Sequence, residues 1–223
     1  MPRTNRVSVG NIVYHVINRT NGRVCLFKED KDYKHFESLL KEARDLTDMR
    51  ILSYCLMPNH FHLVLYPKKD NDLSEFMRWL TTTHVRQVRV LTGSVGHGHL
   101  YQGAYKSFPV EEDKHLVDLI RYVEQNPFRA GLVKKAQDWL WSSLYIRKFG
   151  TFKQKKLLDE LPTELPHNYL SSVNEIYDSE KLSRLRNSII KGLPYGSDKW
   201  TDSMVEKYNL VATTRGVGRP KRV

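Results

Sequence analysis

The order of strand-like and helix-like segments is the feature of this sequence that most constrains its fold. Strand-like segments are rich in β-branched and aromatic residues, whereas helix-like segments repeat their apolar residues at helical spacing. The sequence predicts strands over residues 11–18, 49–57, 60–66 and 104–110, and helices that begin near residues 30, 72–74 and 111–113. The Asn126-Pro127 pair is expected to end the last helix. This order predicts an α+β fold, namely a ferredoxin-like βαββαβ sheet with one added helix. We expect its helices to pack on one face and to leave the other face open for a site.

The character of the chain changes after residue 150. The following stretch is rich in lysine and interrupted by prolines, residues 174–192 form a helical patch, and the end is basic. A chain of 223 residues is long enough for one domain with its own core and an appendage. We therefore expect a domain over residues 1–150 and a basic, partly helical C-terminal extension over residues 151–223.

Charge and cysteine content indicate the partner and the compartment. The chain has 36 Lys and Arg against 25 Asp and Glu, a net charge of +11, which favours nucleic acid as the partner. Its two cysteines, Cys25 and Cys55, are too few for a disulfide framework, so we expect buried thiols in a reducing compartment. Neither an apolar leader nor a long apolar run is present in the sequence. These features predict a cytoplasmic protein that does not enter a membrane.

A histidine pair lies on the third predicted strand. His60 and His62 are two residues apart, so both side chains leave the same face, while the apolar Phe61 leaves the other. Two such imidazoles can converge on one metal ion. The alternative is a pair of partly exposed histidines without a ligand, and the turn at Pro58-Asn59, which fixes the strand start, favours the metal site. His97 and His99 have the same spacing, but they lie among glycines in a loop that does not fix their geometry, and the remaining histidines have no partner signal.

The last predicted helix places a tyrosine beside its buried stripe. Tyr122 lies at the margin of the apolar positions, and Asn126 lies one turn later. Most tyrosines in such a place only pack with a solvated hydroxyl. Tyr122 would become a nucleophile if this helix crossed the histidine face and a metal neutralised a phosphate beside it. Asn126 could then offer an amide oxygen as a third ligand to Mg²⁺ or Mn²⁺.

Basic and aromatic residues alternate along a long stretch without acids. The 35 residues from Phe76 to Val110 contain no Asp or Glu. Arginine with interleaved aromatic rings suits backbone neutralisation and base stacking on single-stranded DNA. The expected DNA-binding residues are Arg78, Arg86, Arg89, Tyr105 and Lys106, together with Arg219, Lys221 and Arg222 of the basic C-terminal end. A solvated helix face and a disordered tail are the alternatives.

Several motifs resemble those of one enzyme family. YCLMPNHFHLVL (residues 54–65) resembles the histidine-hydrophobe-histidine (HUH) motif of single-strand DNA transposases, and RYVEQNPFRAGLV (residues 121–133) resembles their catalytic-tyrosine helix. GHLYQGAYKS (residues 98–107) also fits. Four further segments resemble the branch called REP-associated tyrosine transposases: residues 14–27, 141–143, 191–200 and 218–222.

The resemblance implies a mechanism and a substrate class. It implies that His60, His62 and Asn126 hold Mg²⁺ or Mn²⁺, and that Tyr122 attacks a DNA phosphate to give a 5′-phosphotyrosine and a free 3′-hydroxyl. The implied substrates are short palindromes folded into single-stranded hairpins, which a second 3′-hydroxyl attack would rejoin. One departure is Ala104, where family members commonly carry arginine.

Two other functions remain open from the sequence. One is a hairpin DNA-binding protein derived from a transposase without catalysis, and the other is a Zn²⁺- or Mn²⁺-dependent nuclease in which water attacks and Tyr122 only packs. The resemblance favours a monomer, although a homodimer with exchanged helices also fits.

Overall fold

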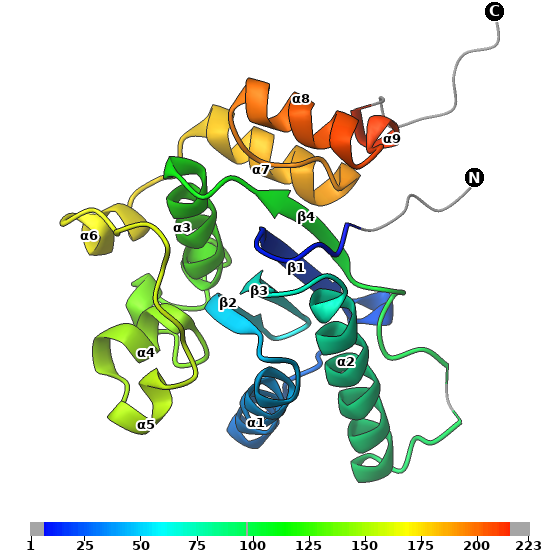
Figure 1. Cartoon of the computed structure of the whole chain (residues 1–223). Coiled ribbons are helices and arrows are strands. Elements are labelled where there is room, and N and C mark those ends of the chain that lie inside the picture. Colours follow the sequence, from blue (N-terminus) through cyan, green and yellow to red (C-terminus); the bar gives the residue numbers. More distant parts are fainter. Residues whose placement is uncertain (1–6, 97, 215–223) are drawn as a thin grey trace, which may run out of the picture.

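A single antiparallel sheet organises the chain. The computed structural model describes residues 7–96 and 98–214. The strands are β1 (Val13–Arg19), β2 (Arg50–Met57), β3 (His60–Tyr66) and β4 (Lys106–Val110), arranged in the order β2-β3-β1-β4 (Figure 1). Neighbouring strands are antiparallel throughout. The structure therefore confirms the predicted α+β fold with its βαββαβ order.

Three long helices cover the sheet. The helices α1 (Asp30–Thr47) and α2 (Asp72–Leu91) lie on one face, and α3 (Lys114–Arg129) lies on the other (Figure 1). The shorter helices follow α3 in the chain: α4 (Ser143–Phe149), α5 (Phe152–Lys155), α6 (Tyr169–Val173), α7 (Ser179–Lys191), α8 (Asp198–Lys207) and α9 (Val211–Thr214). Short 3₁₀ turns lie at Asn21–Arg23 and Ala136–Asp138.

The first face of the sheet carries the larger core. Phe61, Leu63 and Leu65 of β3 point to this face and pack with Phe36 of α1 and Phe76 of α2. All five side chains are fully buried. The alternation read from the third strand therefore gives the correct apolar face.

The second face is also covered, which corrects the expectation of an open face. A separate apolar cluster joins Val64 of β3 and Phe108 of β4 to Leu119 and Val123 of α3. The reason is visible in β1, where the successive residues Val13 and Tyr14 point to opposite faces and are both fully buried. A strand that is apolar on both sides needs packing on both sides.

The last helix of the predicted fold is longer than expected. Pro127 lies inside α3, which continues to Arg129. Pro127 has no N–H for the carbonyl of Val123, four residues earlier. The Asn126 side-chain Nδ2 donates to that carbonyl at 3.3 Å and to the carbonyl of Tyr122 at 2.9 Å. The asparagine thus replaces the hydrogen bond that proline removes, and the helix does not stop.

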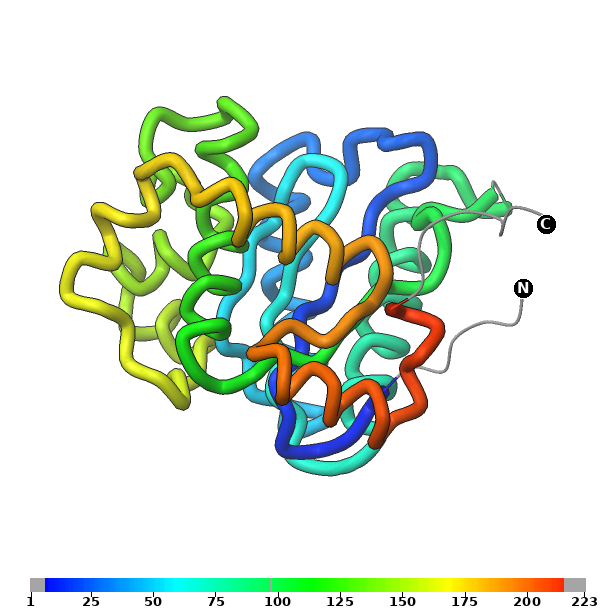
Figure 2. The backbone as a smooth tube through the Cα atoms, turned by 90° about the horizontal axis from the view of Figure 1, so that it is seen from above, coloured from blue at the N-terminus to red at the C-terminus, as the bar shows by residue number. Residues whose placement is uncertain are grey.

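The C-terminal part of the chain contacts both edges of the sheet. Asp159 exchanges hydrogen bonds with Ile51 of β2, and Tyr195 forms a parallel bridge with Val110 of β4. Figure 2 shows α7 and α8 lying close to β4 and α3. Covering edge strands in this way blocks unwanted pairing. The division at residue 150 stays a prediction.

Two smaller expectations concern exposure and membranes. Cys55 is buried as expected, but Cys25 is exposed, because it lies in the loop after β1 rather than in the core. None of the helices within residues 7–96 and 98–214 combines the length and the apolar character needed to cross a bilayer.

A buried histidine predicts how stability depends on pH. His84 of α2 is 1 % exposed and its Nδ1 lies 2.7 Å from the Tyr101 hydroxyl, and burial lowers its pKa to about 3. The unfolded chain, with a histidine pKa near ~6.5, binds more protons in acid, so stability falls as the pH drops from ~6.5 towards 3. We expect a loss of about 1.4 kcal/mol per pH unit from this group.

Urea unfolding across this pH range measures the effect. His84→Gln should flatten the slope by about one proton, and His167→Gln, at an exposed position, is the matched control. An unchanged slope in His84→Gln would contradict the assignment.

Candidate active site

Two histidine rings of β3 face the same side of the sheet, towards α3. The ring centroids of His60 and His62 are 5.1 Å apart, and His62 is 2 % exposed. The Nδ1 of His60 donates to the Asn59 side-chain oxygen at 2.6 Å, because that oxygen can only accept. The Nδ1 of His62 lies 2.9 Å from Nε2 of His15 on β1. In both rings Nδ1 takes part in a hydrogen bond, so Nε2 is the ring nitrogen left to bind a metal.

Both rings are held in the neutral state that a metal ligand needs. Burial, with a smaller contribution from the Arg19 charge, lowers the pKa of His60 to about 4. Burial also lowers the pKa of His62 well below its usual value, and the neighbouring His15 and His60 add to this effect. Neutral imidazoles bind metal without first losing a proton.

The candidate nucleophile lies against this pair. The ring of Tyr122 on α3 packs edge-on to His62 with 5.9 Å between centroids, and the side chain is mostly buried. The guanidinium carbon of Arg129, two turns later, lies 5.0 Å from the centre of the Tyr122 ring. The Asn126 amide nitrogen donates to two helix carbonyls, and its side-chain oxygen has no such bond to α3. The structure thus brings Tyr122 to the histidine face.

A buried carboxylate fixes the helix that presents Tyr122. Glu124 is fully buried on α3, and its carboxylate accepts from Ser143 at 2.6 Å and from Tyr169 at 2.7 Å. It also pairs with Arg147, which in turn donates to the carbonyl of Leu52 on β2. These bonds tie α3 to the sheet and to α4 and α6, so they determine where Tyr122 lies.

Three residues of the site were not predicted from the sequence. These are His15, Arg19 and Arg129. In the antiparallel register Arg19 of β1 is paired with His60 of β3. Nε of Arg19 and Nη1 of Arg129 are buried without a hydrogen-bond partner among the described residues. Unpaired guanidinium donors suit a phosphate, and these two lie beside the Tyr122 ring (Arg129) and opposite His60 (Arg19). Only the strand register, which sequence patterns do not give, could have placed His15 and Arg19 here, whereas Arg129 lies two helical turns after Tyr122 on α3.

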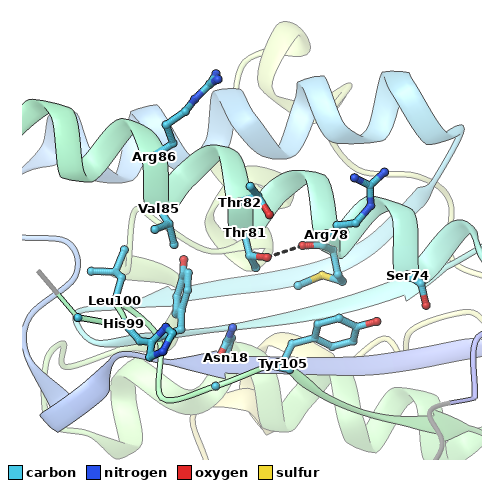
Figure 3. Close-up of a pocket in the computed structure, with 15 residues that line it drawn as sticks. Asn18, Ser74, Arg78, Thr81, Thr82, Val85, Arg86, His99, Leu100 and Tyr105 are labelled. Carbon is cyan, nitrogen blue, oxygen red and sulfur yellow. Dashed lines mark hydrogen bonds between the residues drawn. The ribbon is translucent and has the colours of Figure 1, made fainter. Parts of the chain in front are cut away.

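Three of the predicted DNA-binding residues line one groove. Arg78, Arg86 and Tyr105 lie along a groove of about 720 Å³ between α2 and residues 98–105 (Figure 3). Arg89 instead donates to Ser94 and to the carbonyl of Gly98, so it holds the loop that follows α2. Arg219, Lys221 and Arg222 lie outside the described residues.

A second groove adjoins the first beside β1. Lys106 and Arg19 line it, together with Ile189 and Ile190 of α7, and its volume is about 660 Å³. The two grooves share Asn18, Gly103 and Ala104. No Asp or Glu is among the residues that line either groove. The surface therefore offers a polyanion a continuous route free of acidic side chains.

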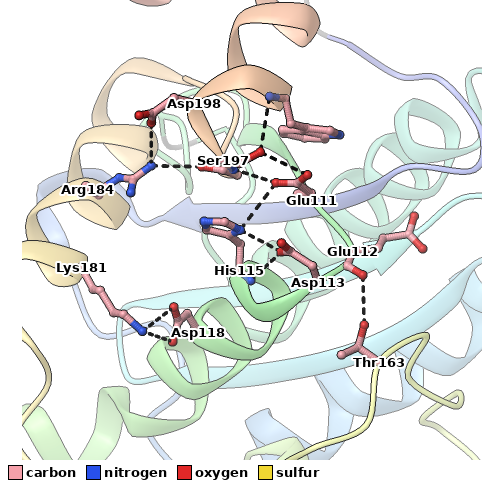
Figure 4. Close-up of polar contacts among 12 residues, drawn as sticks. Glu111, Glu112, Asp113, His115, Asp118, Thr163, Lys181, Arg184, Ser197 and Asp198 are labelled. Atoms are coloured by element: carbon pink, nitrogen blue, oxygen red, sulfur yellow. Dashed lines mark hydrogen bonds and ion pairs between the residues drawn. The ribbon is translucent and has the colours of Figure 1, made fainter.

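Another group of residues also has metal-ligand chemistry. Ligand atoms of Glu111, Asp113 and His115 lie within 4.8 Å of one another. The His115 Nδ1 donates to Asp113 at 2.8 Å, and Glu111 accepts from the backbone of Ser197 at 2.6 Å (Figure 4). Asp113 is also the N-cap of α3. These hydrogen bonds join the start of α8 to the start of α3.

Comparison with known proteins gives consistent results. Residues 8–126 match the family model described as "Transposase IS200 like". A protein of Haemophilus influenzae named as a REP-associated tyrosine transposase is 24 % identical over 123 residues, which is 51 % of this chain and 70 % of that protein. The solved structure of a REP-associated tyrosine transposase bound to a REP hairpin has a TM-score of 0.56 and 18 % identity, covering 65 % of this chain and 84 % of the other. At that identity the structural match supports the fold.

Proposed function

The chain belongs to the IS200-like transposase family, and on this premise we propose that it cleaves and rejoins single-stranded DNA at hairpin-forming palindromic repeats. The intermediate is a 5′-phosphotyrosine on Tyr122. The observation that supports this most strongly is the packing of the Tyr122 ring on His62, in the same chain and next to His60. The hairpin substrate is inferred from the relatives, one of which is bound to such a hairpin.

The proposed metal ligands are His60, His62 and Asn126. Two neutral imidazole nitrogens and one amide oxygen suit Mn²⁺ or Mg²⁺. When bound, the ion supplies positive charge that polarises the scissile phosphate. The Glu111, Asp113 and His115 group forms hydrogen bonds that join α8 to the start of α3, so we propose a structural role for it.

The covalent step exchanges one phosphate ester for another. The Tyr122 hydroxyl loses its proton as its oxygen bonds to phosphorus, the bond from phosphorus to the 3′ oxygen breaks, and that oxygen takes up a proton. Arg129 and Arg19 offer buried guanidinium donors to the phosphate oxygens as charge develops. Attack by another 3′-hydroxyl reverses these changes and rejoins the strand. No nucleotide cofactor is needed, because one phosphate ester replaces another.

The two adjoining grooves are the proposed path of the single strand. Arg78 and Arg86 neutralise backbone phosphates along α2. The strand then crosses Gly103, which has no side chain, and Ala104, which has only a methyl group, and reaches Lys106 and Arg19 beside His60. On this path the strand passes over Ala104. Arg19, which lines the same groove, supplies a positive charge near position 104, where relatives commonly carry arginine. We also propose that the C-terminal extension, residues 151–223, forms one wall of the second groove through α7. We further propose that the protein is a monomer in which one chain forms the complete site.

Replacing two groove arginines tests this path. Arg78→Ala/Arg86→Ala should weaken binding of a single-stranded hairpin and reduce the slope of log affinity against log salt by about 1.4, from ~0.7 per lost contact. Fluorescence anisotropy over a range of salt concentrations measures both quantities. Lys153→Ala/Lys155→Ala, on the exposed surface of α5, removes the same charge elsewhere. An equal loss of slope in both double variants would contradict a defined path.

Covalent trapping tests the function itself. Wild-type protein is incubated with Mn²⁺ and hairpin oligonucleotides from the DNA that flanks its gene, and the products are separated on a denaturing gel. We expect a protein–DNA adduct that disappears when a chelator is added. Binding without adduct or cleavage would instead support the non-catalytic binding protein. Cleavage without adduct would support the hydrolytic nuclease.

A further inference from the structure

We propose that His15 is a positioning residue whose Nε2 accepts a hydrogen bond from Nδ1–H of His62 and so directs the Nε2 lone pair of His62 to the metal. This inference rests on the proposed function, because it concerns the same metal site. His15 lies on β1, whereas both histidine ligands lie on β3. His15 would therefore act on the metal only indirectly, by orienting the His62 ring.

The packing of the two rings leaves little freedom. His15 is fully buried, and its Nε2 is 2.9 Å from Nδ1 of His62. The His15 ring also contacts Phe108 of β4, with 5.0 Å between ring centroids. Since β1 lies between β3 and β4, the ring is held from both sides. The His15–His62 contact is thus fixed by the sheet.

A single proton occupies the line between the two nitrogens. If His15 donates it, then Nδ1 of His62 is the acceptor, and the neutral His62 ring carries its own proton on Nε2, which blocks that atom as a ligand. If His62 donates it, Nε2 of His62 is a lone pair. Metal binding therefore requires His15 to accept, with its own proton on Nδ1.

His60, the other proposed histidine ligand, also has a hydrogen-bond acceptor at its Nδ1. The side-chain oxygen of Asn59 can only accept, so it fixes the His60 proton on Nδ1. His15 has the corresponding place next to His62. The difference is that an imidazole can either donate or accept.

An unpaired nitrogen distinguishes this role from simple packing. Nδ1 of His15 is buried and has no hydrogen-bond partner among the residues that the structure describes. Such groups are rare in folded proteins, and each asks for an explanation. An apolar ring at position 15 would fill the space without leaving a polar atom unpaired, so the His62 contact is the reason we give for a histidine.

Metal affinity of two variants tests the proposal. His15→Phe keeps a ring but cannot accept a hydrogen bond from His62. We expect this variant to bind Mn²⁺ about 10- to 100-fold more weakly than wild type. His15→Gln offers an accepting amide oxygen and should recover part of this loss. Calorimetric titration of the full chain without DNA measures the affinity, and thermal unfolding shows that each variant is folded. His84→Phe, an equally buried histidine on the other face, should keep wild-type affinity.

Each outcome separates the role of His15 from the metal site itself. Wild-type affinity in a folded His15→Phe would overturn the role of His15 alone. Absence of Mn²⁺ binding to wild type would contradict the metal site of the proposed function. If both His15 variants fail to fold, nitrogen-15 NMR of wild type with Mg²⁺ decides. A proton on Nδ1 of His62 supports the proposal, and a proton on Nε2 of His62 overturns it.

Discussion

Tyr122→Phe is expected to abolish the covalent adduct while leaving hairpin binding intact. The substitution removes only the hydroxyl, which is the attacking group in the proposed mechanism. Loss of a nucleophile that forms a covalent intermediate lowers turnover by about a thousandfold or more. The yield of adduct on a denaturing gel and the hairpin affinity measured by anisotropy separate the chemical step from binding.

The packing around Tyr122 makes this substitution a clean one. The ring contacts His62 at 5.9 Å and Tyr177 at 6.4 Å between centroids, and phenylalanine keeps both contacts. Tyr177→Phe is the matched control. It removes a hydroxyl close to the site, and that hydroxyl donates to the carbonyl of Asp118. We expect adduct from Tyr177→Phe. Adduct from Tyr122→Phe at the wild-type level would show that another group is the nucleophile.

Glu124→Ala should be the most destabilising single change in α3, by about 3–5 kcal/mol. The carboxylate is fully buried and accepts from Ser143 and Tyr169, and its removal leaves the Arg147 charge without its partner. Breaking one side of a buried ion pair is costly because the remaining charge stays desolvated. The free energy of unfolding in urea measures the loss.

A surface glutamate provides the control for this effect. Glu160→Ala removes an exposed carboxylate and should change stability by less than about 0.5 kcal/mol. A Glu124→Ala variant within about 1 kcal/mol of wild type would contradict the idea that this network fixes α3. Because the network also determines where Tyr122 lies, we expect Glu124→Ala to lower the adduct yield even at temperatures at which it is folded.

The sequence predicted those parts of the fold that depend on local pattern. The strand His60–Tyr66 has the predicted bounds because its alternation is regular and Pro58-Asn59 marks its start. The placement of Phe61 on the α1 and α2 side follows from the same alternation. Tyr122 could be placed beside the apolar stripe of α3 from helical spacing alone.

Other parts depend on contacts between distant segments. The covered second face follows from α3 and α7 packing on strands far away in the sequence. The extension of α3 past Pro127 depends on how the Asn126 side chain points, which spacing does not determine. His15 has no partner within its own segment, and only the β1–β3 register brings it to His62. The same register brings Arg19 to His60.

The proposed DNA path depends both on local sequence pattern and on contacts between distant segments. The stretch from Phe76 to Val110 stands out in the sequence because it lacks acids. Its two ends meet in space, so that Arg78 of α2 and Tyr105 before β4 line the same groove. Arg89 belongs to the same stretch but binds its own loop, a role that composition could not reveal.

Mass spectrometry of the adduct tests the central claim most directly. Trypsin cleaves after Arg121 and Arg129, so Tyr122 lies in a peptide of residues 122–129 that contains no other tyrosine. After nuclease trimming of the trapped adduct, we expect this peptide to carry the mass of a nucleotide joined through its 5′ phosphate, with the bond on Tyr122. A nucleotide on any other peptide, or an unmodified 122–129 peptide in protein that has cut its substrate, would contradict the tyrosine mechanism.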